Sequence, residues 1–304
     1  MSRTRTLSDA AWARIEPLMP TASRKGGRPF QEHRRVLEGI VWRYRTGSPW
    51  RDLPAEFGPW QTAWKRHRRF SGDGTWDRIY AEILVDADAV GEIEWAVSVD
   101  STINRAHQHA TNLPRDTGAL SSYKNLREEP PDHAIGRSRG GLSTKIHHLV
   151  DGRGLPLVVL VGAGQAGDAP MFPVLMDHLK VSRRGPGRPR SRPDRVRGDK
   201  AYSSRAIRTH LRERGIVAVI PEPSNQQGHR QRRGSRGGRP VSYDIEDYKS
   251  RNVVERSFNE DKQWRGLATR YDKLALTYRG GAVLRAVTLW LKRLDRVRTP
   301  VRSL

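Results

Sequence analysis

The hydrophobic period of the chain changes at Trp95-Ala-Val-Ser-Val-Asp100, and this stretch divides the molecule into two parts. Its apolar residues Trp95, Val97 and Val99 alternate with smaller or polar residues, which is the two-residue period of a strand with one buried face. Upstream of it, apolar residues recur at the three- and four-residue intervals of amphipathic helices. The stretch therefore predicts the first strand of a sheet that follows a helical module.

The helical module consists of short helices joined by tight turns such as Gly58-Pro59. Its most basic helix is expected from Trp60 to Phe70, directly after a turn, which is the arrangement of helix-turn-helix DNA readers. We therefore predict a small all-α, helix-turn-helix-like DNA-binding domain over residues 1–88. The alternative is a packing domain with a solvated charged face. The side chains expected to face DNA are Gln61, Lys65, Arg66, Arg68 and Arg69.

The second part of the chain has the element order of a mixed α/β domain, which we place at residues 89–304. Two apolar runs flank the turn Asp151-Gly152-Arg153-Gly154 and predict a hairpin. Strand-like and helix-like runs then alternate toward the end of the chain. Two stretches rich in arginine interrupt this pattern, at 181–194 and 222–244. Both are predicted to be basic loops, and the second is expected to be an exposed or disordered insertion.

Composition indicates a polyanionic partner. The 304 residues include 56 Lys plus Arg against 33 Asp plus Glu, for a formal net charge of +23. Arginine dominates the basic set and pairs with phosphate through two hydrogen bonds, which favours nucleic acid. No apolar run approaches the roughly 18 residues of a membrane span, and we expect no membrane partner. The absence of cysteine excludes disulfides and thiolate sites, and it is compatible with a cytoplasmic protein that joins the nucleoid when bound to DNA.

A second informative stretch runs from Tyr248 to Lys262 and contains neither Gly nor Pro. It is predicted to form one helix. At about 100° per residue, Tyr248, Arg251, Glu255 and Lys262 fall within about 60° of one another on the helical wheel. A carboxylate flanked by two cations and a phenol can hold a metal ion and a phosphate together. The alternative is a solvated face with ordinary ion pairs.

Three acidic residues are candidates for one site. Asp100 and Asp199 each end a predicted strand, and side chains at the carboxyl ends of neighbouring strands converge. Glu255 would join them from the late helix, whereas Glu260 and Asp261 project away from its polar face. Three carboxylates repel one another unless cations neutralise them, and hard divalent ions such as Mg²⁺ do so with oxygen ligands. Two such ions about 4 Å apart favour displacement at phosphorus, which predicts phosphodiester cleavage or transfer.

The motifs around these acids resemble those of the DDE transposases of bacterial insertion sequences, in the large four/five group with a Tyr-Arg-Glu-Lys signature. The main matches are Ser98-Val-Asp100-Ser-Thr, Arg197-Gly-Asp199-Lys-Ala-Tyr-Ser and the run Y-x2-R-x3-E-x6-K that begins at Tyr248. Supporting matches are Gly136-Arg-Ser-Arg-Gly-Gly-Leu-Ser-Thr-Lys-Ile-His, Gly164-Gln-Ala-Gly-Asp and Trp264-Arg-Gly-Leu-Ala-Thr-Arg-Tyr-Asp-Lys. The resemblance covers nearly the whole chain and implies a ribonuclease-H-like, mixed-sheet catalytic domain.

The resemblance also implies a mechanism and a set of roles. Asp100, Asp199 and Glu255 would be the catalytic metal ligands, for two Mg²⁺ or Mn²⁺ ions. Tyr248, Arg251 and Lys262 would hold the DNA backbone near them. The protein would bind the terminal inverted repeats of its element, cut a phosphodiester with water and join the freed 3′-hydroxyl to target DNA. Its partner would be double-stranded DNA, and cutting two ends together implies a homodimer or a higher oligomer.

Other interpretations remain open on the sequence alone. A non-catalytic DNA-binding protein, such as a regulator or a decayed transposase, would share the basic charge but has no need of three convergent carboxylates. A related metal-dependent nuclease would share every site residue and would show no requirement for particular end sequences. The pairs His107-Gln-His109 and His147-His148 could bind zinc, although we favour surface or packing roles for them.

Overall fold

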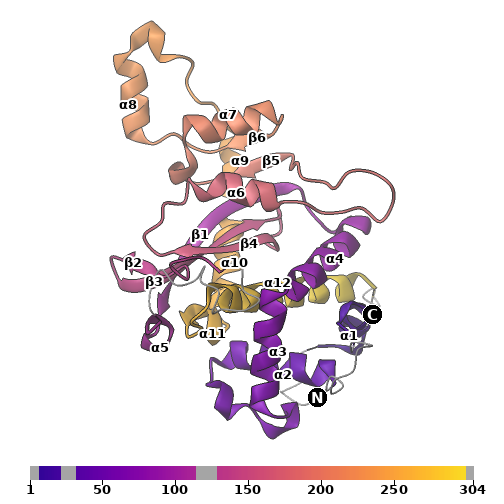
Figure 1. The fold of residues 1–304 in the computed structure, drawn as a ribbon. Helices are drawn as coiled ribbons and strands as arrows, with labels where there is room; N and C mark the ends of the chain where they lie inside the picture. Colours follow the sequence, from indigo (N-terminus) through magenta and orange to yellow (C-terminus); the bar gives the residue numbers. More distant parts are fainter. Residues whose placement is uncertain (1–6, 22–31, 114–128, 299–304) are drawn as a thin grey trace, which may run out of the picture.

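The computed structural model describes residues 7–21, 32–113 and 129–298, and it shows a sheet with helices packed at one end and an arm protruding at the other (Figure 1). The first part of the chain is helical, as predicted. Its elements are α1 (Asp9–Ile15), η1 (Glu16–Leu18), α2 (His33–Thr46), η2 (Trp50–Asp52), η3 (Ala55–Phe57), α3 (Trp60–Gly72) and α4 (Thr75–Ala89). The basic helix expected from Trp60 to Phe70 is confirmed as α3.

The second part is built on one seven-stranded mixed sheet. Its strands are β1 (Ala96–Ala106), β2 (Gly136–Ser138), β3 (Gly141–Val150), β4 (Pro156–Ala163), β5 (Arg195–Arg197), β6 (Val217–Val219) and β7 (Thr269–Arg270). The order is β2-β3-β1-β5-β6, with β4 paired to β3 and β7 paired to β1. The predicted mixed α/β class and the β3–β4 hairpin are both confirmed.

The central strand is β1, which continues the predicted alternation well past Asp100. It runs antiparallel to β3, with Asp100 opposite His148. On its other edge it runs parallel to β5, with Ser98 opposite Arg197. Helices connect and cover the sheet: α5 (Gln108–Thr111), α6 (Met171–His178), η4 (Lys200–Tyr202), α7 (Arg205–Glu213), α8 (Ser224–Arg232), η5 (Gly234–Gly237), α9 (Ile245–Lys249), α10 (Asn252–Lys262), α11 (Arg265–Ala268) and α12 (Ala275–Arg298).

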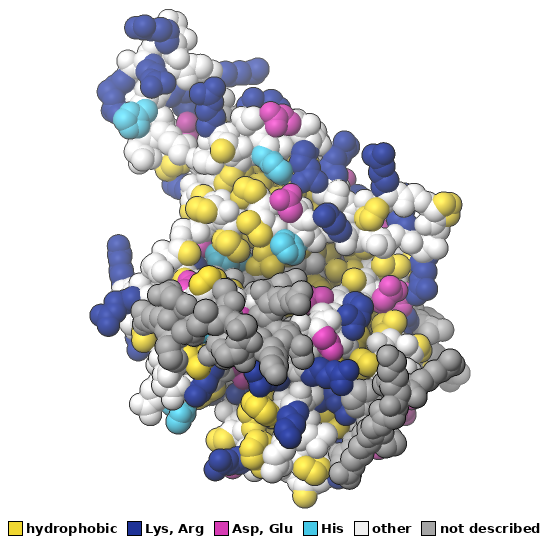
Figure 2. Space-filling model, in the orientation of Figure 1, with side chains coloured by type: hydrophobic (Ala, Val, Ile, Leu, Met, Phe, Trp, Pro, Cys, Tyr) yellow, Lys and Arg dark blue, Asp and Glu magenta, His cyan; other side chains and the backbone are white. Residues whose placement is uncertain are grey.

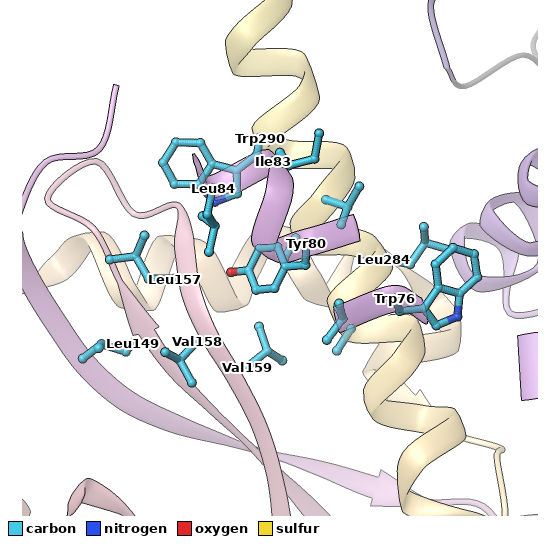
Figure 3. Close-up of a cluster of buried hydrophobic side chains, with 14 of the residues drawn as sticks. Trp76, Tyr80, Ile83, Leu84, Leu149, Leu157, Val158, Val159, Leu284 and Trp290 are labelled. Carbon is cyan, nitrogen blue, oxygen red and sulfur yellow. The ribbon is translucent and has the colours of Figure 1, made fainter. Parts of the chain in front are cut away.

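One hydrophobic core joins the N-terminal helices to the sheet through α12. Figure 3 shows side chains of α4 and α12, among them Tyr80 and Trp290, gathered over side chains of strand β4 such as Val159. The Tyr80 hydroxyl and the Trp290 indole N–H both donate to the carbonyl of Pro156, each at 2.6 Å. These two hydrogen bonds satisfy the polar atoms of large buried side chains, so the helical module is anchored on the sheet edge.

The glycine pair Gly280-Gly281 lies inside α12 without interrupting it. Both glycines provide room for other helices to approach. A Cβ atom added to Gly281 would lie 2.3 Å from the Tyr44 ring of α2, and one added to Gly280 would lie 2.2 Å from the Ser71 hydroxyl of α3. The pair therefore marks close helix packing, which outweighs its low helix propensity.

The basic stretch 222–244 was predicted to be a basic loop, exposed or disordered, and the loop prediction is corrected in part because the stretch includes a helix. It contains α8 and η5, and α8 extends away from the sheet at the end opposite the N-terminal helices (Figure 1). Its exposure is confirmed, because α8 buries none of its residues.

Candidate active site

Asp100 and Asp199 lie on neighbouring parallel strands. Ser98 of β1 is opposite Arg197, the last residue of β5, so each aspartate stands two residues beyond the same paired position. Asp199 follows the strand directly and caps η4, because its carboxylate accepts the backbone N–H of Ala201 at 2.9 Å. The structure therefore brings these two acids together at one end of the parallel pair.

The carboxylate of Asp100 is half-buried and has two fixed hydrogen bonds. Its Oδ1 accepts the backbone N–H of Ser101 at 2.8 Å, and its Oδ2 accepts a guanidinium N–H of Arg251 at 2.9 Å. Burial raises the pKa of Asp100 above its usual range, and the nearby charge of Asp199 adds to the rise, against the opposing effects of Ser101 and Arg251. The site thus contains a carboxylate whose charge is only partly compensated by the protein.

Arg251 joins Asp100 to Glu255. While one terminal nitrogen of the guanidinium contacts Asp100, the other contacts the Glu255 carboxylate one helical turn further along. The Glu255 side chain is 51% exposed, so it can rotate without disturbing the core. Arg251 therefore links Glu255 to Asp100.

The segment that was predicted to be one helix, Tyr248 to Lys262, is divided in the structure. Helix α9 ends at Lys249 and α10 begins at Asn252, with hydrogen bonds of the i,i+3 type between them, such as Arg251 N–H to the Tyr248 carbonyl at 2.9 Å. Tight turns of this kind within a helical run accompany local constraint. The constraint here is Asp247, whose carboxylate accepts from Arg195 at 2.9 Å and from Arg197 at 2.6 Å on β5.

Two other residues of the signature, Tyr248 and Lys262, lie before and after Arg251 and Glu255 in the chain. The Tyr248 ring is half-buried and packs edge-on against Tyr243, with ring centroids 5.7 Å apart. Lys262 is exposed at the end of α10, two turns beyond Glu255. Within the described part of the chain its ammonium group has no hydrogen-bond or ion-pair partner. Both side chains are therefore accessible to a ligand that approaches Arg251.

The donor set fits a hard divalent ion in chemistry, because all three candidate ligands are carboxylates. Among residues 7–21, 32–113 and 129–298, however, no three His, Asp or Glu side chains are grouped closely enough to hold one. The Arg251 guanidinium lies where it neutralises Asp100 and Glu255. Binding of a metal ion by all three acids therefore requires Glu255 to leave Arg251, which its exposure permits.

A second polar cluster supports Asp100 from the neighbouring strand, and it was missed in the sequence. The Ser101 hydroxyl donates to Asp168 at 2.6 Å, and the ammonium group of Lys145 donates to the same oxygen at 2.8 Å. Burial raises the pKa of the Tyr202 phenol, and the charges of Asp100, Asp168 and Asp199 add to the rise. Asp168 belongs to the motif Gly164-Gln-Ala-Gly-Asp, which was the available signal.

We expect Asp168→Asn to lower the rate of DNA cleavage by about tenfold, because residues that orient a ligand through hydrogen bonds have effects of 10- to 100-fold. Single-turnover cleavage rates measure this, with the thermal unfolding midpoint as a check on folding. Asp177→Asn is the matched control, since Asp177 is an exposed acid on α6. An unchanged cleavage rate in Asp168→Asn would show that Ser101 and Asp100 need no such support.

The predicted DNA contacts of the helical module differ in accessibility. Lys65 and Arg69 are exposed on α3, and Arg68 is half-buried with its guanidinium 5.8 Å from the Trp64 ring. Arg66 is only 7% exposed, and its Nη1 lies 2.9 Å from the Nδ1 of His33. The choice of Arg66 is therefore corrected: the helical period turns it into the domain interior, where it packs with α2.

The histidine pairs occupy different surroundings. His147 and His148 are buried on β3, and His148 stacks on Phe258 with centroids 4.8 Å apart. Burial, together with the charge of neighbouring His147, lowers the pKa of His148 to about 3, so it is neutral. His107 and His109 stack on each other at 4.9 Å. None of the described histidines belongs to a group of three candidate metal ligands.

Glu260 and Asp261, which were expected to project away from the polar face, lie outside the candidate site. Asp261 is 3% exposed and lies 3.3 Å from the Nε2 of His148, and burial raises its pKa to about 7. Its neighbour Glu260 faces Arg285 at 3.4 Å. Among the described residues, neither forms a hydrogen bond or ion pair with Asp100, Asp199 or Arg251. No described helix is long and apolar enough to cross a membrane.

Two family profiles match the chain. Residues 92–281 match the family described as "Transposase DDE domain", and residues 7–80 match the one described as "Putative transposase of IS4/5 family". The first match covers over half of the chain and includes Asp100, Asp199 and Glu255. The second covers most of the described N-terminal helices.

Several curated proteins are similar to parts of the chain. "Uncharacterized protein y4sN" of Sinorhizobium fredii is 35% identical over 112 residues, which are 37% of this chain and 86% of that protein. "Insertion element IS402 uncharacterized 16.2 kDa protein" of Burkholderia cepacia is 36% identical over 107 residues, 33% of this chain and 73% of its own. "Putative transposase for insertion sequence element IS6501" of Brucella ovis is 30% identical over 155 residues, 50% of this chain and all of that protein. No solved structure matches the chain.

Proposed function

This chain belongs to the DDE transposases of the IS4/5 type, and on that premise we propose that it binds the ends of its own insertion element, cuts the DNA there and joins the cut end to target DNA. Its ribonuclease-H-like mixed sheet is the expected fold of this family. The observation that supports the cutting site best is that Asp100 stands beside Asp199 at one end of the parallel β1–β5 pair and shares the Arg251 guanidinium with Glu255.

The three carboxylates would hold divalent ions, which we propose to be two Mg²⁺ or Mn²⁺ ions per site. When bound, such ions neutralise charge on the phosphate and activate the attacking oxygen. The family implies divalent metal dependence in general. The protein contributes a fixed position for Asp100, through Ser101 and Arg251, and a movable one for Glu255.

The cations around the acids would position the DNA. With Glu255 released, the Arg251 guanidinium keeps Asp100 and gains free N–H groups for a phosphate. Lys262 and Tyr248 would contact the same backbone on either side. Holding the phosphodiester in line with the attacking oxygen is the main requirement of phosphoryl transfer, because this chemistry needs no covalent enzyme intermediate.

The experiment that tests this proposal uses a labelled duplex containing the DNA that flanks the gene, with Mg²⁺, Mn²⁺ or a chelator. We expect cleavage at one defined junction only when the metal is present, followed by joining of the freed 3′-hydroxyl to a second duplex. Tight binding without cleavage would favour the non-catalytic alternative. Cleavage of any duplex with no preference for the flanking DNA would favour the nuclease alternative.

The helical module would recognise the element ends through the exposed face of α3. We expect Lys65→Gln combined with Arg69→Gln to reduce the salt slope of DNA binding by about 2, because each lost phosphate contact contributes about 1. Fluorescence anisotropy at several salt concentrations measures this slope. Arg35→Gln combined with Arg78→Gln is the charge-matched control on other exposed positions of the module. Equal losses in both double variants would contradict a specific role for α3.

We propose further that the active assembly on DNA is a dimer or a higher oligomer, because two element ends must be cut together. We place this assembly in the cytoplasm. The mass of the complex that the protein forms with a duplex containing one element end tests this. A complex in which a single protein copy holds two such duplexes would contradict it.

A further inference from the structure

The arm formed by α8 and η5 has no apolar helix face that packs against the body of the protein. Helix α8 has nine residues, none of them buried and none of them apolar. Helices this short are marginal in water without tertiary packing, and a helix that is polar all round contributes nothing to a core. Polar contacts link α8 to the body, such as the Ser203 hydroxyl with Gln226 at 3.0 Å. The arm therefore adds little to the stability of the fold, and binding of a ligand explains its presence better.

An open groove of about 530 Å³ lies between α7 and the arm. We call it the arginine groove, because six arginines line it. One wall carries Arg205, Arg208 and Arg212 of α7, and the other carries Arg230, Arg233 and Arg239 of the arm. Figure 2 shows the Lys and Arg side chains gathered over this arm.

The positive charge of the arginine groove is largely uncompensated. Its lining contains one acid, Glu222, which already pairs with Arg230. Arg208 is oriented by a hydrogen bond to the Ile220 carbonyl at 2.8 Å. Within residues 7–21, 32–113 and 129–298, the guanidinium groups of Arg205 and Arg233 have no hydrogen-bond or ion-pair partner. Arg212 and Arg239 are equally unpaired there.

We propose that the arginine groove binds the phosphodiester backbone of the DNA that is being cut, within about five base pairs of the scissile bond. Ser204 lines the groove and is five residues from Asp199, so their Cα atoms are at most about 18 Å apart. A duplex rises about 3.4 Å per base pair, so this reach spans about five pairs. The inference rests on the proposed function, because it places the groove beside the cutting site.

Nucleic acid is the occupant that the chemistry favours. Guanidinium groups from two walls match a chain of phosphates, each of which accepts two N–H groups. A lipid surface is disfavoured because α8 has no apolar face to insert. An acidic protein segment, including one from a second copy of this chain, is the competing occupant that the experiment must separate.

The test compares two double variants of the full chain that lose the same charge from the same arm region. Arg205→Gln with Arg233→Gln removes one arginine from each wall of the groove. Arg232→Gln with Arg236→Gln removes two arginines that do not line it. Affinity for the labelled flanking duplex is measured with a chelator present, so that no cleavage occurs. Since α8 has no buried side chain, both variants should fold, and circular dichroism confirms it.

We expect the groove variant to bind about 30-fold more weakly at 0.15 M salt, because each neutralised phosphate contributes about 0.9 to the salt slope. The control variant should stay within about threefold of wild type. Ethylation of single phosphates within about five base pairs of the junction should weaken wild-type binding, and at the phosphates that Arg205 and Arg233 contact it should weaken the groove variant less.

Two results would overturn the inference. Equal losses in both double variants would show a diffuse charge effect, and a groove variant that loses self-association but keeps its DNA affinity would favour a protein occupant. These outcomes are separate from failure of the proposed function. If the wild-type protein binds the duplex but never cuts it, the proposed function is contradicted and the groove result stays valid. If the wild-type protein cuts and the groove variant binds DNA as tightly as wild type, only the groove inference is contradicted.

Discussion

Replacing Asp199 by asparagine is expected to lower the rate of DNA cleavage by about a thousandfold or more. The substitution keeps the size and the hydrogen bond that caps η4, but it removes a negative charge beside Asp100. Charge stabilisation at a phosphoryl-transfer site contributes several kcal/mol, and each 1.36 kcal/mol corresponds to about tenfold in rate. Single-turnover cleavage of the labelled flanking duplex measures the loss, while DNA affinity should stay near that of wild type.

Asp194→Asn is the matched control for this prediction. Asp194 directly precedes the same strand, β5, but its side chain is 67% exposed and pairs with Arg190 at 3.3 Å. Exposed ion pairs of this kind contribute little, so its cleavage rate should equal that of wild type. A similar small decrease in both variants would mean that Asp199 has no special part in the reaction.

Replacing Arg270 by methionine is expected to lower the free energy of unfolding by about 3–5 kcal/mol. Arg270 of β7 has no exposed surface, and its guanidinium donates five hydrogen bonds. Four of them go to backbone carbonyls, at distances of 2.8 to 3.1 Å. Methionine fills part of the volume but leaves these carbonyls without a donor, which is costly in a buried position.

Urea unfolding followed by circular dichroism measures this change. Arg105→Met is the control, because Arg105 is an exposed arginine on β1, paired through its backbone with Thr269. Its effect should stay within about 0.5 kcal/mol. If Arg270→Met unfolded at the urea concentration of wild type, the buried network would not be what joins β7 to the residues before β2.

Much of the fold could be predicted because its signals are local. The alternation from Trp95 to Val99 identified β1, and the glycine-containing turn at Asp151 identified the β3–β4 hairpin. The two aspartates were placed together by a general property of parallel strands, whose carboxyl ends share one edge. These inferences need only the period of the sequence and the direction of the strands.

The features that could not be predicted depend on contacts between distant residues. The helix from Tyr248 to Lys262 is divided because Asp247 is held by Arg195 and Arg197, some 50 residues earlier in the chain. Arg66 is buried because α3 turns that position toward α2. In both cases local propensity gave the correct type of structure, and tertiary contacts decided its details.

Asp168 shows how a site residue can be present in the sequence and still be missed. Its motif was recognised only as a supporting match, because no strand period or helical wheel connects it with Asp100. The connection runs through Ser101, which is adjacent to Asp100 in the chain and reaches Asp168 only after the sheet has formed. Residues that act through a neighbour in this way leave no pattern of their own in a single sequence.

The measurement that tests the central claim most directly is a change of metal preference in Asp199→Cys. The chain contains no cysteine, so the new thiol would be the only one. Mg²⁺ strongly prefers oxygen ligands, whereas softer transition ions accept a thiolate more readily. If Asp199 binds the metal, Asp199→Cys should be inactive with Mg²⁺ and should regain cleavage with Mn²⁺. Each cleavage rate of the variant is divided by the wild-type rate with the same ion, and this ratio should be on the order of tenfold higher with Mn²⁺ than with Mg²⁺. Asp199→Ala should stay inactive with both ions. Equal activity of Asp199→Cys with both ions, or a wild-type rate with Mg²⁺, would contradict the assignment of Asp199 as a metal ligand.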